Sequence, residues 1–173
     1  MTKPIINIAD VELRRIGHGA NAPAAKNAPE KFQAQLGDIG RRIGAKKIGC
    51  NVTLVPAGHR AWPFHNHRIN EEMFVVLEGS GEVRIGSETF PIRKGDVIAH
   101  PPGGPETAHQ IVNTSDAELK YLAISTLESP EICDYPDSKK FAVMTFEPRP
   151  DGKPKFWRFA ARDGDSVDYW DGE

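Results

Sequence analysis

Apolar and polar residues alternate with a period of two through the middle of the chain, which is typical of β-strands with one buried face. In one segment Ile48, Cys50, Val52 and Leu54 alternate with polar or small residues. Met73 to Leu77 is a wholly apolar run, short enough for a strand buried on both faces. Further strands are predicted at residues 83–85, 90–92, 97–99, 109–112 and 119–125.

Glycine and proline separate these predicted strands. Gly86-Ser87 predicts a two-residue hairpin turn of the kind that begins with glycine. Gly58, Gly79 and Gly95 stand at turns where a positive φ is expected. No segment of residues 46–127 has a convincing 3.6-residue period, so the pattern predicts an all-β fold, a sandwich or a barrel.

The two ends of the chain differ from this middle part. Residues 1–45 are predicted to form an N-terminal arm, with a short helix carrying Phe32 and Leu36. Residues 128–173 are predicted to be a β-rich C-terminal extension that packs on the barrel or on a partner subunit, the whole being one domain. Within the extension, strands are predicted at 141–144, 156–159 and 167–170, and a turn at 151–154.

Composition excludes several classes of protein. The 173 residues carry a net charge of −2, so no global basic field for nucleic acid is expected. No apolar run approaches the ~20 residues that span a bilayer, and the first residues do not resemble a signal peptide, so a cytoplasmic protein is expected. Cys50 and Cys133 do not make a disulfide framework, and neither is expected to be catalytic.

Histidines concentrate in the predicted barrel. His65 and His67 are two residues apart, which places both rings on one face of a strand. Glu72 opens the next strand, and His109 lies on a later one. Imidazole nitrogen and carboxylate oxygen favour Mn, Fe, Co, Ni or Zn, and the lack of a cysteine cluster disfavours structural zinc. The pattern predicts a divalent transition metal held by these four side chains.

At these residues the chain resembles the cupin superfamily. The first cupin motif is matched by Gly58-HRAWPF-His65-Asn66-His67-RINE-Glu72-MFVVLE-Gly79, whose last gap favours Glu72 over Glu71 as the ligand. The second motif is matched by Gly95-DVIAH-Pro101-Pro102-Gly103-GPETA-His109-QIV-Asn113. The gap before His65 is one residue longer than usual, and the gap before His109 is five rather than two.

The resemblance covers residues 47–127 and implies a double-stranded β-helix, a jelly-roll-like barrel. It also implies that His65, His67, Glu72 and His109 converge within ~2.0–2.3 Å of one ion. The segment 105–126 is similar to small single-domain bacterial cupins, some of which are described as sugar-phosphate isomerases.

Three functions follow from such a site. Four ligands leave two positions of an octahedron open, where a metal can polarise the carbonyl of a sugar or sugar phosphate in an isomerase. Loaded with iron, the same ligands suit a dioxygenase acting on a small thiol or diketone. A non-catalytic module that binds a small molecule is the third. No helix-turn-helix segment is present, which disfavours a DNA-binding regulator.

Other side chains near the motifs are candidates for the pocket. Arg60 and Arg68 bracket the histidine pair and can meet an anionic substrate, while Glu71, His59 or another nearby carboxylate can serve as the base of an isomerase. His59 and His100 flank the motifs and can line the mouth. The exposed sheet edge expected of the barrel, the arm and the aromatic tail together predict a homodimer.

Overall fold

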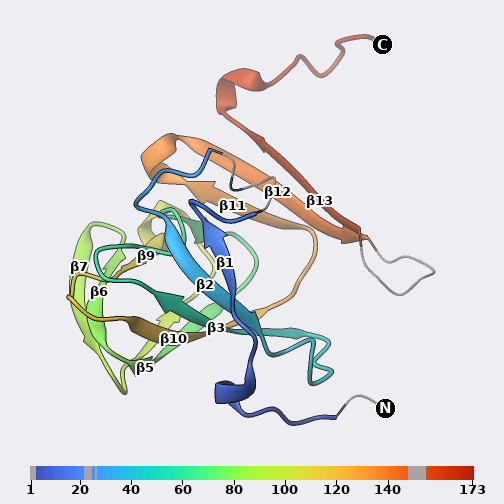
Figure 1. The fold of residues 1–173 in the computed structure, drawn as a ribbon. Coiled ribbons are helices and arrows are strands. Elements are labelled where there is room, and N and C mark those ends of the chain that lie inside the picture. Colours follow the sequence, from blue (N-terminus) through green and yellow to red (C-terminus); the bar gives the residue numbers. More distant parts are fainter. Residues whose placement is uncertain (1–2, 22–24, 26, 148–154) are drawn as a thin grey trace.

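The computed structural model describes residues 3–21, 25, 27–147 and 155–173 and has an all-β architecture (Figure 1). Its helices, in the described part, are three-residue 3₁₀ turns, none long and apolar enough to cross a membrane. The strands are β1 (Arg14–Gly17), β2 (Gln33–Asp38), β3 (Ile48–Val55), β4 (Asn66–His67), β5 (Glu72–Glu78), β6 (Ser80–Ile85), β7 (Glu88–Arg93), β8 (Val97–His100), β9 (His109–Val112), β10 (Leu119–Thr126), β11 (Glu131–Tyr135), β12 (Lys140–Glu147) and β13 (Lys155–Ala161). The turns are η1 (Ile8–Asp10), η3 (Pro105–Thr107), η4 (Pro136–Ser138) and η5 (Asp163–Asp165).

The strands form three antiparallel sheets. The largest has the order β1-β2-β3-β10-β5-β8, the second β13-β12-β11-β4, and the third β7-β6-β9. The main core joins the first and third sheets: Val55, Phe74, Val76, Leu119 and Tyr121 come from one, Val83, Ile92 and Ile111 from the other. This is the predicted double-stranded β-helix.

The strands predicted at residues 48–125 are present, with bounds that are equal or up to three residues wider at either end. The hairpin β6–β7 pairs Ile85 with Glu88 across Gly86-Ser87, and Gly86 has a φ of +54°. At Gly79, with a φ of +81°, an added Cβ would collide with the carbonyl of Glu118. Glycine is therefore required there both by the backbone conformation and by the close approach of another strand.

The helix predicted around Phe32 and Leu36 is wrong, because these residues lie at and within β2, which pairs with β1 and β3. A spacing of four residues fits one face of a helix and equally one face of a strand, and Ala34 between them completes the strand face in the core. The first residues pack on the outer face of the main sheet, where Val11 joins Ile39 and Val52 in a second core cluster.

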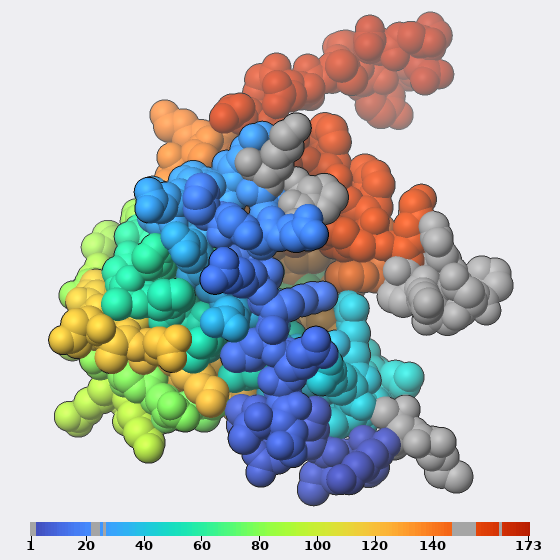
Figure 2. Space-filling view, in the orientation of Figure 1, coloured from blue at the N-terminus to red at the C-terminus, as the bar shows by residue number. Residues whose placement is uncertain are grey.

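The C-terminal extension adds β11, β12 and β13, which form a sheet whose strand β11 pairs with the short β4 (Figure 1). The strand predicted at 167–170 is wrong: these residues lie outside any strand, and Tyr169 is 85% exposed. Figure 2 shows the last residues standing clear of the rounded body. The turn predicted at 151–154 lies outside the described residues.

Candidate metal centre

Backbone pairing brings the candidate ligands together. An isolated bridge joins His65 to His109, with His65 N donating to His109 O over 3.1 Å and His109 N to His65 O over 2.8 Å. His67 ends β4 and Glu72 begins β5, so a four-residue loop connects two candidate ligands. The strands thus hold together residues that are up to 44 positions apart in the sequence.

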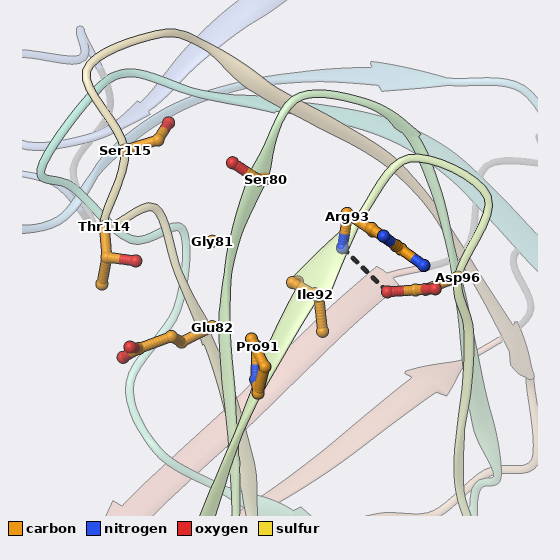
Figure 3. A pocket seen from close by; sticks show the side chains of 9 residues that line it. All are labelled: Ser80, Gly81, Glu82, Pro91, Ile92, Arg93, Asp96, Thr114 and Ser115. Carbon is orange, nitrogen blue, oxygen red and sulfur yellow. Dashed lines mark hydrogen bonds between the residues drawn. The ribbon is translucent and has the colours of Figure 1, made fainter.

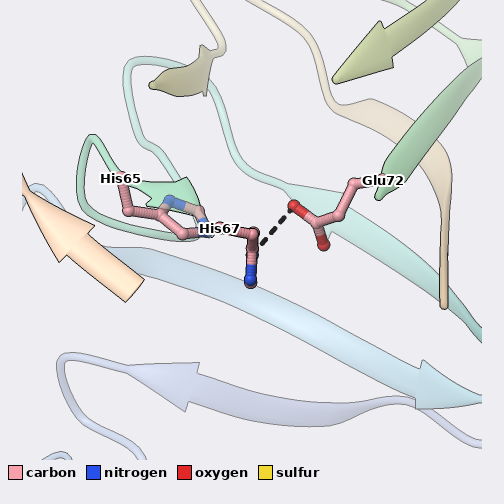
Figure 4. Close-up of side chains that lie close together, drawn as sticks. All are labelled: His65, His67 and Glu72. Atoms are coloured by element: carbon pink, nitrogen blue, oxygen red, sulfur yellow. Dashed lines mark ion pairs between the residues drawn. The ribbon is translucent and has the colours of Figure 1, made fainter. Parts of the chain in front are cut away.

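The four predicted ligands lie together. The ligand atoms of His65, His67 and Glu72 lie within 4.8 Å of one another (Figure 4). Glu72 Oε2 lies 3.2 Å from His67 Nε2 and 3.0 Å from His109 Nε2. The rings of His65 and His109 are 4.8 Å apart, and His109 is 2% exposed. Such a convergence of imidazoles on one carboxylate oxygen is the donor set that a first-row metal requires.

The outer ring nitrogens are held by other partners. Nδ1 of His65 lies 2.8 Å from the carbonyl of Pro63, and Nδ1 of His109 lies 3.4 Å from that of Thr107. Nδ1 of His67 lies 3.2 Å from Sγ of Cys133. Each ring therefore keeps Nε2 for the centre, and the buried Nε2 of His67 has no hydrogen bond in the described part of the chain. Metal-binding histidines are oriented in this way, so these residues fit a metal ion.

The protonation states of His65 and Glu72 suit a metal, whereas His67 must release a proton to bind one. Burial would lower the pKa of His67, but hydrogen bonds with Cys133, Glu131 and Glu72 outweigh it and raise this pKa to about 12. Burial lowers the pKa of His65 to about 4, with a further contribution from His109. Burial would raise the pKa of Glu72, but hydrogen bonds with His109 and His67 outweigh it and hold this pKa well below its usual range. A neutral imidazole and an ionised carboxylate are the forms that bind metal ions.

The other predicted pocket residues lie differently. Arg68 forms a bidentate ion pair with Asp134, with both distances 2.9 Å. The ring of His59 binds the carbonyl of Ala57 in its own turn. Glu71 is exposed, with its amide bound to the hydroxyl of Thr126. The buried Nε of Arg60 has no hydrogen bond among the described residues, and Arg60 pairs through its backbone with Val112.

His100, by contrast, is part of the cluster. It lies opposite Glu72 in the pairing of β5 with β8, is 2% exposed, and its ring stacks on that of His109 with centroids 3.8 Å apart. Burial, helped by His109, lowers the pKa of His100 to about 3. A neutral ring packed against His109 fixes the plane of that candidate ligand.

Three residues of β11 near the site were missed by the sequence analysis. Glu131, Cys133 and Tyr135 alternate along β11, and His67 lies opposite Cys133. Tyr135 stacks on His65 with centroids 6.1 Å apart. Burial raises the pKa of Tyr135, and the nearby Arg158 and His67 oppose this. The alternation was visible in the sequence, but it stands in a polar stretch broken by proline, and nothing local indicates its pairing with β4.

A separate hollow of about 720 Å³ lies on β6 and β7 and contains none of these side chains (Figure 3). Its wall includes Arg93, whose amide donates to Asp96 over 2.8 Å, and Ser115. This hollow is wide open, and no histidine lines it. It is therefore separate from the histidine cluster.

Comparison with known proteins agrees with the fold. Residues 51–125 match the family model described as "Cupin domain". An uncharacterized protein of Methanocaldococcus jannaschii is 38% identical over 72 residues, which are 42% of this chain and 54% of the relative. The match thus spans about half of that relative's length.

Two solved structures share the architecture over most of the chain. A protein of Silicibacter pomeroyi, described as a sugar phosphate isomerase from a cupin superfamily, is 22% identical with a TM-score of 0.73 over 97% of this chain and 98% of its own. A protein of Acidithiobacillus ferrooxidans, provisionally given the same activity, is 20% identical with a TM-score of 0.68 over 90% of this chain and 92% of its own. The ends of the chain thus belong to the shared fold, and residues 51–125 are similar to a cupin domain.

Proposed function

We propose that this protein is a metal-dependent cupin enzyme that acts on a sugar or sugar phosphate as an isomerase. The observation that carries the proposal is the convergence of His65, His67 and Glu72 within 4.8 Å, with His109 bound to the same carboxylate. The names of the two solved relatives support the substrate class, and their likeness in structure extends beyond the barrel to both ends of the chain.

Nε2 of His65, His67 and His109 and the carboxylate of Glu72 would hold the metal. When bound, it would polarise the carbonyl or hydroxyl oxygen of the substrate and ease proton transfer at the adjacent carbon. The chain itself orients the site through the outer ring nitrogens and excludes water with Phe74. That ring meets His109 edge-on, with centroids 5.5 Å apart, and packs on Tyr121 in the core.

Turnover with defined metals tests this proposal. Protein loaded with Zn or Mn is expected to interconvert an aldose phosphate and the corresponding ketose phosphate, and to be indifferent to oxygen. Protein that carries iron after anaerobic purification and consumes oxygen with a thiol or diketone would instead be a dioxygenase. Binding of sugars without turnover by any metal form would identify a non-catalytic module. The variant His18→Ala changes an exposed histidine that is far from the motifs in sequence. It serves as a control and is expected to leave the turnover unchanged.

We also expect a homodimer, with the second copy covering the C-terminal hairpin. Phe156 and Trp157 are neighbours on β13, so they point to opposite faces, and both are about half exposed, at 51% and 43%. β13 is an edge strand with apolar side chains on both faces, which a single barrel leaves uncovered. Light scattering should give twice the 19.1 kDa of one chain.

The variant Trp157→Glu is expected to shift the equilibrium between dimer and single chain towards single chains. Lys94→Glu, on an exposed turn, is expected to leave it unchanged. A mass of one chain for the unmodified protein at micromolar concentration would exclude the dimer.

A further inference from the structure

The sheet formed by β4, β11, β12 and β13 presents one face to the candidate metal centre. His67 lies opposite Cys133, so alternate residues of β11 share the side of His67. In the pairing of β11 with β12, Lys140 lies opposite Tyr135 and Met144 opposite Glu131. This face therefore carries Glu131, Cys133, Tyr135, Lys140, Ala142 and Met144. Arg158 of β13, which lies opposite Met144, is on the same face.

Tyr135 connects the centre with two basic side chains on this face. Its ring stacks on His65, and Nζ of Lys140 lies 5.0 Å from the ring centroid. The charge of Arg158 also acts on the phenol of Tyr135. Lys140 therefore lies beside the ring that stacks on His65, and Arg158 lies on the same face of the sheet, opposite Met144.

No carboxylate in the described part of the chain forms an ion pair with Lys140 or Arg158. Asp134 lies on the opposite face of β11 and is paired with Arg68. Asp137 in the η4 turn binds Arg84. Glu131 shares the face, but its two oxygens accept hydrogen bonds from the amides of Ile69, Asn70 and Ile132. Neither positive charge thus has an ionic partner among the described residues.

We propose that Lys140 and Arg158 bind the phosphate group of a phosphorylated polyol whose hydroxyl or carbonyl end lies at the metal centre, with Tyr135 between the two ends. This inference rests on the proposed function and narrows its substrate class from sugars to sugar phosphates. Arginine and lysine donate charge-assisted hydrogen bonds to phosphate oxygens, which are stronger than neutral ones. It also replaces the earlier expectation that Arg68 meets the anion, because Asp134 occupies the Arg68 guanidinium.

Calorimetric binding of inorganic phosphate and of a hexose phosphate to metal-free protein tests the inference without turnover. Lys140→Ala and Arg158→Ala are each expected to weaken the binding of both ligands about tenfold, the worth of one charge-assisted hydrogen bond. Binding of the unphosphorylated hexose to the metal-loaded protein is expected to stay unchanged. Arg158→Lys should recover part of the loss.

The double variant Arg15→Ala with Lys94→Ala is the matched control, because it removes the same two charges from exposed positions elsewhere. The inference would be overturned if the Lys140→Ala and Arg158→Ala variants bound phosphate as tightly as the unmodified protein. It would also be overturned if the unmodified protein did not bind phosphate. Loss of phosphate binding in a protein that isomerises nothing would support the phosphate site and reject the isomerase. If the unmodified protein isomerises its substrate and the variants bind phosphate as before, the isomerase is supported and the phosphate site is rejected.

Discussion

Replacing His67 by alanine is expected to remove the bound metal. Nε2 of His67 is buried, lies 3.2 Å from Glu72 Oε2 and has no hydrogen bond among the described residues, so it can coordinate an ion once its proton is released. Losing even an outer partner of a ligand costs about 10–100-fold in metal affinity, and losing the ligand itself should cost ~100-fold or more. Elemental analysis after dialysis, followed by competition with a chelating dye, measures both content and affinity.

Cys133 gives this experiment a graded series. Its sulfur is the neighbour of His67 Nδ1 at 3.2 Å, so Cys133→Ala should weaken metal binding by about 10–100-fold. Cys133→Ser, which retains a hydrogen-bonding atom, should fall between that variant and the unmodified protein. Cys50→Ala, at the other free cysteine, should leave the affinity unchanged. If His67→Ala retains a full equivalent of metal, the assignment of the centre is wrong.

The strands that alternate cleanly were predictable, since their side chains face one core. β3 is an example, and the hairpin at Gly86-Ser87 follows from turn chemistry alone. β2 was mistaken for a helix, because the spacing of Phe32 and Leu36 fits both structures. The pairing of β2 with β1 and β3 decides between the helical period and the strand period. Pairing between distant segments is not visible in the local sequence.

The candidate site also has a part that was predictable from the sequence and a part that was not. The resemblance to cupins indicated His65, His67, Glu72 and His109, and the structure brings these four together. The second wall was not predictable, because β11 joins β4 through a pairing of His67 with Cys133, 66 residues later in the chain. Tyr135 reaches His65 only through that pairing. A motif records the ligands, whereas the residues that select a substrate come from the pairing of distant strands.

Replacing Glu131 by alanine is expected to lower the free energy of unfolding by about 3 kcal/mol or more. Its carboxylate accepts from the amides of Ile69 (3.3 Å), Asn70 (2.9 Å) and Ile132 (2.8 Å), and also from the side-chain amide of Asn70. Each buried donor left without a partner costs about 1–3 kcal/mol. These donors fix the loop between His67 and Glu72, so metal affinity should fall in the same variant.

Urea unfolding measures the first effect as a shift of the midpoint at constant slope. Glu128→Ala is the matched control: the Glu128 side chain is exposed, and its contacts with Asn70 run through its own backbone amide and carbonyl. That variant should stay within about 0.5 kcal/mol of the unmodified protein. If Glu131→Ala is as stable as Glu128→Ala, the carboxylate does not hold the loop. If it is less stable but binds metal normally, the loop does not position the ligands at its ends.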